Sequence, residues 1–449
     1  MSGLFGTLNT ATKGLMAQQT ALHTTSHNIS NANTKGFSRQ RVDLKADLAF
    51  TLGGVGQLGT GVRMTGIVRL VDDYVTKQIR TENGTMTKFQ AKSEVMEQLE
   101  IIFNEPSDTS LNFNLGEMFD SWQELSKNPE SLNSKTIVVE KAKTLADTLN
   151  HIANQINSLK DDTNSQIEKS VTDLNSIVSN LDTLNKQIFN ISVKGHVPND
   201  LLDQRDLMLQ DLSAITNFDT SFDKYGRVEV SIGGTPIKGE IKVGDLENLN
   251  ITSGTLKGNK DAVEDLNLQK ENLDKFTATM ATAINTVHGT DFFVNSNSSE
   301  GIKVSAELQA DNSKVNAGKE VDGPEGDGSR ALAIARLRNT KIDFTGNTPL
   351  NYNADTMEIE NQAGGITIEG AYNNIVTKVG ITKEHSDNMV ANQEILLDQL
   401  ILRRESTSGV QIDEEVTNVI KFQKSFEANS KVISVLAEML DVLINRTGV

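Results

Sequence analysis

The sequence predicts an α+β multidomain protein, in which both chain ends form a long α-helical, coiled-coil-like stalk and a β-rich middle domain is inserted between them. Apolar residues recur at every seventh position near both ends, which is the spacing of helices that coil around other helices. Between the ends, short strand-like runs are separated by glycine-rich turns. A chain of 449 residues is long enough for roughly two to four domains.

The first helix is predicted over residues 4–31. Asn31, Asn33 and Gly36 mark its end, and these residue types commonly end helices. Residues 35–70 then change to loop and strand. The apolar stripe of this helix consists of Leu8, Leu15, Leu22 and Ile29.

The last helix is predicted to begin after a break at Ser408 and Gly409. Two helices that each carry one narrow apolar stripe bury little surface when they pair only with each other. We therefore expect helices of partner molecules to complete the burial. Alternatively, the two stripes pack only against each other within one molecule. The predicted interface residues of this helix are Ile412, Val419, Phe426, Ile433 and Leu440, with Phe422, Leu436 and Leu443 in the neighbouring stripe.

The middle of the chain contains one very long regular segment. Over residues 136–191 apolar residues alternate at spacings of four and three, which predicts a helix of about 80 Å. Other helices are expected over 71–104, 262–288, 331–338 and 371–405. Short strands are expected over 220–222, 227–232, 237–243 and 250–252.

These elements predict three domains. Residues 1–34 and 408–449 would form a terminal helical domain, the inner coiled coil. Residues 35–212 and 360–407 would form a helical stalk domain, and residues 213–359 a β-rich outer domain.

Composition excludes several classes of function. The net charge of −17 argues against a general nucleic-acid-binding protein, which needs lysine and arginine to neutralise phosphates. The chain has no cysteine, so disulfides, thiolate catalysis and cysteine-based zinc sites are excluded. No apolar run is long enough to span a membrane, and no cleaved secretory signal is expected at the N-terminus.

Two motifs suggest chemistry and lack the context for it. Residues 54–59 match the glycine pattern of dinucleotide-binding loops, but a strand-like run follows them where that motif requires a helix. His23 and His27 have the spacing of a helical metal pair, but neither a cysteine nor a nearby third ligand accompanies them. We therefore expect no catalytic site, no cofactor and no metal.

Several segments resemble a known family. Residues 28–40 read NISNANTKGFSRQ and resemble the asparagine-rich signature of bacterial flagellar rod, hook and hook-associated proteins. Residues 408–446 resemble the C-terminal helix of the same axial proteins. Residues 197–206 (VPNDLLDQRD), residues 284–291 (INTVHGTD) and the long central helix resemble the hook-associated junction members. The likeness fades over 292–370.

The resemblance implies a non-enzymatic structural subunit at the extracellular hook–filament junction of the flagellum. Such proteins are exported unfolded through the flagellar type III apparatus, and their terminal helices pack in the inner layer of a ring of identical copies. The implied partners are the hook protein, a second hook–filament junction protein and an export chaperone on the C-terminal helix. The implied signature turn consists of Asn28, Asn31, Asn33, Gly36 and Phe37, where Gly36 can take a positive φ.

Two other functions stay open at this point. The closer alternative is another flagellar axial subunit, such as a hook or distal rod protein. The remote alternative is a nucleotide-binding enzyme that uses the glycine loop at 54–59. Neither nucleic acid nor membrane insertion is expected among the interactions of the chain.

Overall fold

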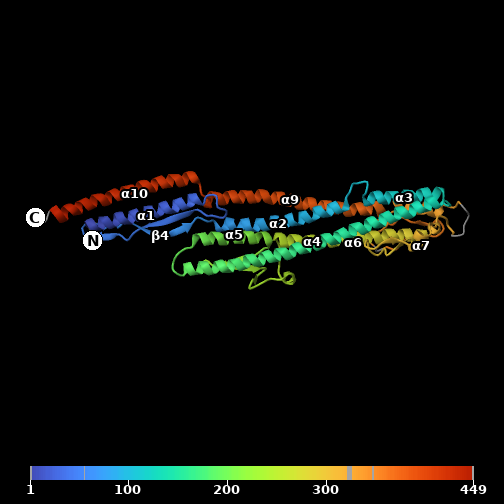
Figure 1. The fold of residues 1–449 in the computed structure, drawn as a ribbon, viewed down its shortest axis with the longest axis horizontal. Coiled ribbons are helices and arrows are strands. Elements are labelled where there is room, and N and C mark those ends of the chain that lie inside the picture. The colour runs from blue at the N-terminus through green and yellow to red at the C-terminus, as the bar shows by residue number, and fades with distance from the viewer. Residues whose placement is uncertain (1–2, 55, 321–325, 346–347, 447–449) are drawn as a thin grey trace. The chain divides into compact units, whose positions relative to one another are not determined.

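The structure is a computed structural model that describes residues 3–54, 56–320, 326–345 and 348–446. The chain divides into two units, and most of its long helices are labelled in Figure 1. Unit one comprises Met1–Met86, Val171–Gly254 and Asn392–Val449. Unit two comprises Thr87–Ser170 and Thr255–Ala391. Each unit is therefore assembled from segments that lie far apart in the sequence.

Helices dominate the described chain. The long helices are α1 (Leu4–Ser30), α2 (Asp73–Phe103), α3 (Leu111–Lys127), α4 (Leu132–Ser192), α5 (Asn199–Ile215), α6 (Gly254–His288), α9 (Ile368–Ser408) and α10 (Ile412–Asp441). The short ones are α7 (Ala306–Ala310), α8 (Ser329–Arg336), the 3₁₀ turns η1 (Val243–Glu247), η2 (Asn312–Lys314) and η3 (Leu337–Asn339), and the π-helical turn η4 (Val442–Arg446).

The strands are short and all pair in antiparallel fashion. The sheets are β1 (Gln40–Ala46) with β4 (Val62–Arg69), β2 (Phe50–Leu52) with β3 (Gly56–Leu58), β5 (Asp219–Phe222) with β6 (Val228–Ile232) and β7 (Thr235–Pro236), β8 (Phe293–Val294) with β9 (Lys303–Val304), and β10 (Tyr352–Asn353) with β11 (Glu358–Ile359). Long helical ends around a middle with small sheets confirm the predicted α+β class.

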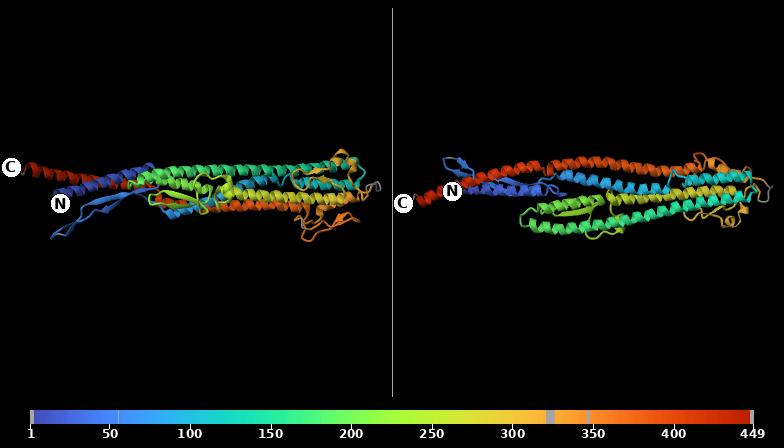
Figure 2. Two further views of the ribbon diagram at one scale, coloured as in Figure 1. Left: turned by 90° about the horizontal axis from the view of Figure 1, so that it is seen from below. Right: turned by 45° about the horizontal axis from the view of Figure 1, so that its top comes forward.

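In unit one, the two ends of the chain lie side by side. Helices α1 and α10 pack along each other, and they stay adjacent in all views (Figures 1 and 2). Helix α1 also contacts strands β1 and β4. The predicted first and last helices are thus confirmed, as is the break between α9 and α10 at Gly409.

Unit two contains a large apolar core. It gathers side chains from α3, α6, α8 and the parts of α2, α4 and α9 that belong to this unit. Full burial of one such side chain stabilises the fold by about 1.5–3 kcal/mol. The largest fully buried side chains are Trp122, Tyr372, Phe103, Phe119, Phe276 and Phe292.

Two predicted strands are wrong. Residues 237–243 and 250–252 form no ladder, and the second half of the first segment leads into η1. An asparagine side chain takes the place of a neighbouring strand at each. Asn175 of α4 binds both the N–H and the C=O of Ile241, and Asn217 binds the C=O of Asn250 and the N–H of Thr252. These backbone groups are satisfied without a sheet.

Candidate assembly site

The face that α1 buries is made of small residues rather than of its heptad leucines. A β-carbon added at Gly14 would lie only 2.9 Å from Oδ1 of Asn429 on α10, so the two helices approach closely there. Leu8, Leu15, Leu22 and Ile29 are only half-buried. The buried residues of α1 are Ala11, Ala17, Ala21, Thr24, Thr25 and Asn28.

The predicted stripe of α10 is covered unevenly. Leu436 is buried, whereas Ile412 and Leu443 each keep 52% of their surface exposed. The remaining predicted residues, Val419, Phe422, Phe426, Ile433 and Leu440, are half-buried. Pairing with α1 therefore covers only part of this predicted stripe, which we call the seam.

Further apolar side chains of α10 are exposed beside this stripe. The heptad analysis missed them, although their spacing of three and four between residues 432 and 442 was visible in the sequence. They are Val416, Ile420, Val432, Val435 and Met439, together with Val442, which begins η4.

The predicted signature turn begins where α1 ends. Asn31 is the C-cap residue, and its Nδ2 donates to the carbonyl of His27 at 3.0 Å. Gly36 has φ +81°, and a β-carbon there would lie 3.3 Å from Cβ of Leu207. Phe37 packs edge-on against the His27 ring at 5.4 Å between centroids. This combination of positive φ and close packing explains why a glycine occupies position 36.

Asn28, Arg39, Gln40 and Glu415 form a connected group that we call the polar clamp. Asn28 Nδ2 donates to the carbonyl of Gln40 at 2.9 Å, and Gln40 N–H donates back to Asn28 Oδ1 at 3.0 Å. Asn28 Nδ2 also donates to Glu415 Oε2 at 3.0 Å, and Arg39 Nε donates to Glu415 Oε1 at 2.8 Å. The clamp joins the end of α1, the start of β1 and the start of α10.

Helix α5 extends this network through its acidic residues. Gln40 Nε2 donates to Asp200 Oδ1 at 2.7 Å, and the N–H of Ser38 donates to Asp203 Oδ2 at 3.0 Å. Arg69 Nη1 lies 2.6 Å from Asp203 and 3.0 Å from Asp206. Burial raises the pKa of Asp203, and the bonds from Ser38 and Arg69 oppose that shift. The NDLLDQRD segment thus holds the signature turn in place.

Other candidate sites do not form a reactive centre. Gly54 and Gly56 lie in the turn and strand of the β2–β3 hairpin, and no helix begins there, so the dinucleotide context is absent. Val55 lies outside the described residues. His27 contacts Asp200 at 3.3 Å, and nowhere in the described ranges do three or more His, Cys, Asp or Glu side chains cluster for a metal.

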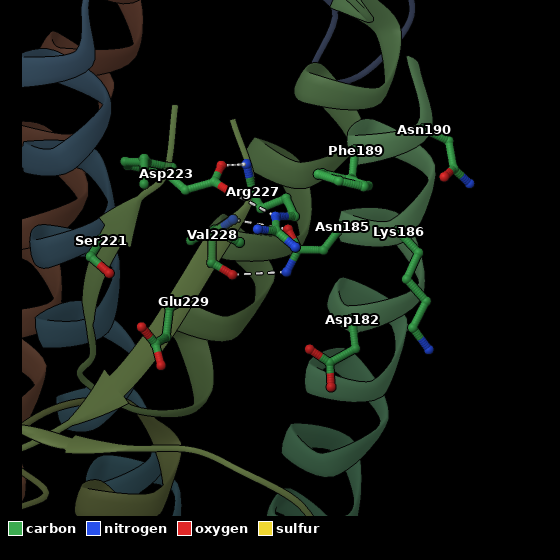
Figure 3. A pocket seen from close by; sticks show the side chains of 11 residues that line it. Asp182, Asn185, Lys186, Phe189, Asn190, Ser221, Asp223, Arg227, Val228 and Glu229 are labelled. Atoms are coloured by element: carbon green, nitrogen blue, oxygen red, sulfur yellow. Dashed lines mark hydrogen bonds and ion pairs between the residues drawn. The ribbon is translucent and has the colours of Figure 1, made fainter. Parts of the chain in front are cut away.

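A cavity of about 560 Å³ lies between α4 and the β5–β6 strands of unit one (Figure 3). Its polar lining is largely paired: Arg227 Nε donates to Asp223 Oδ2 at 2.7 Å, and Asn185 exchanges hydrogen bonds with the backbone of Val228. The Arg227 guanidinium also stacks 4.7 Å from the centroid of Phe189. Arg227, Asp223 and Asn185 are therefore already engaged within the protein.

In the part of the chain that is described, no helix is long and apolar enough to cross a membrane. The candidate assembly site consists of partly exposed apolar side chains next to the buried polar clamp on the paired helices α1 and α10.

Three family profiles match the chain. Residues 8–37 match the flagella basal body rod protein family, and residues 404–446 match the C-terminal region of the flagellar basal body rod FlgEFG proteins. Residues 96–248 match the helical domain of the flagellar hook-associated protein FlgK.

Full-length relatives agree with these profiles. Flagellar hook-associated protein 1 of Bacillus subtilis (strain 168) is 28% identical, with 100% of this chain and 99% of the relative covered. Its counterpart in Salmonella typhimurium is 25% identical, with 98% and 99% covered. The solved flagellar hook junction protein FlgK from Burkholderia pseudomallei is 14% identical and has the same fold, with a TM-score of 0.59 over 74% of this chain and 100% of that one.

Both ends of the chain therefore define a structural protein of the flagellar axis. The match of residues 96–248 and the full-length similarity point to one kind of protein within that class. Over its full length the chain is similar to flagellar hook-associated protein 1, the protein whose helical domain residues 96–248 also match.

Proposed function

We propose that this chain is a non-enzymatic junction subunit, which forms a ring between hook and filament by packing its terminal helices against those of neighbouring copies. One observation carries the proposal: α10 is already paired with α1 and still exposes apolar side chains along its flanks. Exposed apolar surface of this extent usually marks an interaction site.

The two kinds of surface on α10 would have different roles. The half-buried stripe that includes Phe426 and Leu440 would hold α10 to α1 and close the seam. The exposed flank that includes Val432, Val435 and Met439 would receive helices of neighbouring copies. Together with the N-terminal leucines, these residues form the proposed assembly interface.

The signature turn would serve as the joint between the inner helices and the rest of unit one. Asn28, Asn31, Gly36 and Phe37 fix the path of the chain where α1 ends, while Asn33 is exposed and adds no bond among the described residues. We further propose the domain boundaries predicted above, with residues 1–34 and 408–449 as the inner domain.

The proposed partners are the hook protein on one face of the ring and the second junction protein on the other. An export chaperone would cover the exposed flank of α10 before secretion, because an uncovered apolar helix promotes aggregation. The chain would leave the cell unfolded through the flagellar export apparatus.

Deletion and complementation test this function. A strain that lacks the chain should build hooks while its filament subunits escape into the medium; loss of hooks would instead indicate a rod or hook subunit. Complementation with Val435→Asp should fail to retain filaments, since a carboxylate in an apolar interface is costly. Ser434→Asp, at the adjacent exposed position, is the matched control and should restore them. Equal filament retention with both variants would contradict the proposed flank.

A further inference from the structure

A second cavity of unit one, of about 300 Å³, lies beside α2. Helix α2 contributes Lys77, Arg80 and Thr81 to one side of it. The segment after α5 contributes Asp219, and the segment before α6 contributes Ser253. All these residues belong to the same unit, so the cavity is formed within one compact part of the chain.

Arg80 is the unusual residue of this cavity. Its Nη1 atom is buried and has no hydrogen-bond partner among the described residues. Burial lowers the pKa of the Arg80 guanidinium, because the charged form loses hydration that no ion pair replaces. Arg80 as a whole is half-buried, and a buried donor such as Nη1 without a hydrogen-bond partner is energetically costly.

The neighbouring carboxylates do not remove that cost. Asp206 and Asp73 act on Arg80 only through longer-range attraction. Asp206 is already bonded to two other arginines, Arg69 at 3.0 Å and Arg205 at 2.8 Å. The guanidinium therefore keeps one donor, Nη1, that an additional acceptor would satisfy.

The remaining lining favours an anion as that acceptor. Lys77 adds a second positive charge, and Asp219 is the one acidic side chain among the described lining residues. The described lining thus carries a net charge of +1, two bases minus one acid, in a chain whose net charge is −17. Hydroxyl groups from Thr81, Thr85 and Ser253 complete a surface rich in hydrogen-bonding groups.

We infer that this cavity binds a small tetrahedral oxyanion, of the phosphate or sulfate type, through the Arg80 guanidinium with Lys77 at its side. Arginine suits this role because its planar fork of donors matches two oxygens of such an anion. The site lies apart from the terminal helices in sequence, and its existence does not depend on ring assembly.

Thermal unfolding of the purified full-length protein, with phosphate titrated at constant ionic strength, tests the inference. The wild-type melting temperature should rise and saturate with phosphate or sulfate, and should not rise with added chloride. Arg80→Gln should weaken the apparent affinity by at least about tenfold, as expected for loss of a charge-assisted hydrogen bond. Arg227→Gln, which removes an arginine of the cavity between α4 and the β5–β6 strands, should leave the affinity unchanged.

Equal stabilisation of wild type and Arg80→Gln would overturn the inference and indicate an adventitious ion only. If Arg80→Gln does not fold, Lys77→Gln decides the question, because Lys77 is exposed and its loss should not disturb packing. Phosphorus-31 line broadening, measured on the wild type and on Lys77→Gln, should then show weaker binding by the variant. Unchanged binding by Lys77→Gln, or no broadening with the wild type, would also overturn it.

Discussion

Asn28 at the end of α1 donates a hydrogen bond to Glu415 at the start of α10, across 387 residues of sequence. Both residues are almost fully buried, at 1% and 2% exposure. Each carries further bonds inside the polar clamp, so the two chain ends are held together by one continuous network. Unmade buried polar bonds are costly, which makes the clamp a sensitive point of unit one.

Replacing Glu415 with alanine should loosen the joint between the terminal helices. Arg39 and Asn28 would each lose a buried acceptor, and the local free energy of opening should fall by about 2–4 kcal/mol. Hydrogen exchange of peptides covering residues 20–45 and 408–420 measures this. Glu414→Ala is the control, because Glu414 is half exposed and Arg39 would keep Glu415. Equal exchange in the two variants would show that the clamp adds nothing to the joint.

Phe426→Asp and Leu440→Asp should block ring assembly while the rest of the chain stays folded. Both side chains are half-buried in the seam of α10, where an unpaired carboxylate costs several kcal/mol. Circular dichroism should report nearly wild-type helix content, and sedimentation or electron microscopy should detect no rings. Wild-type-like assembly of either variant would contradict the assigned seam.

His288 should make unit two less stable in mild acid. Burial lowers its pKa from 6.5 to about 4, so the folded state holds the neutral form, whereas the unfolded state binds a proton near pH 6.5. Neutral His288 therefore contributes about 3 kcal/mol to the free energy of unfolding above pH 6.5. This contribution decreases as the pH drops from 6.5 to 4 and is absent at lower pH. Comparing the urea midpoints of wild type and His288→Gln at pH 7.5 and 4.5 isolates this effect. A steeper acid loss is expected for wild type, and parallel losses would contradict it.

Gly258→Ala should destabilise unit two strongly. A β-carbon at Gly258 would lie 2.2 Å from the carbonyl oxygen of Lys88, which is backbone and cannot move aside without shifting α2. Overpacking of this kind typically costs about 1–3 kcal/mol. Gly380→Ala, in helix α9 of the same unit, is the matched control, since a β-carbon there meets nothing within 4 Å. The two variants should therefore differ clearly in thermal unfolding, and equal melting temperatures would contradict the close approach.

Asn285→Ala should detach the β8–β9 hairpin from α6. Asn285 Nδ2 donates to the carbonyl of Phe293, and the N–H of Phe293 donates back to Asn285 Oδ1, both at 2.8 Å. Loss of both bonds leaves buried backbone groups unpaired and should cost about 1–3 kcal/mol. Faster hydrogen exchange around residue 293, with unchanged exchange in α10, is the expected readout. Unchanged protection at residue 293 would show that the hairpin is held by its apolar packing alone.

The helices could be predicted from the sequence because their signals are local. Periodic apolar residues fix α1, α4 and α10 almost to their ends, and Gly409 marks the break before α10. The two failed strands, 237–243 and 250–252, have strand-like composition. Asn175 and Asn217, which lie elsewhere in the sequence, bond the backbone of these segments, and these bonds replace strand pairing.

The site could be predicted only in part for the same reason. The heptads predict the seam and the family resemblance predicts the turn, and both stay predictions. The clamp needs Glu415 to meet Asn28 and Arg39, and nothing in the local sequence pairs residues nearly a whole chain apart. Arg80 likewise lies in an ordinary helical pattern. That its Nη1 atom has no hydrogen-bond partner among the described residues can be seen only in the fold.

The polar clamp can be completed only late in the synthesis of the chain. During synthesis the N-terminal segments emerge first, at about 5–20 residues per second. Asn28 and Arg39 are therefore present well before the ribosome has made Glu415, the acceptor that they share. Until then the end of α1 has no buried carboxylate to bind. The newly made N-terminal turn is thus left incomplete, and the chain can close it only after nearly all of its residues have been translated.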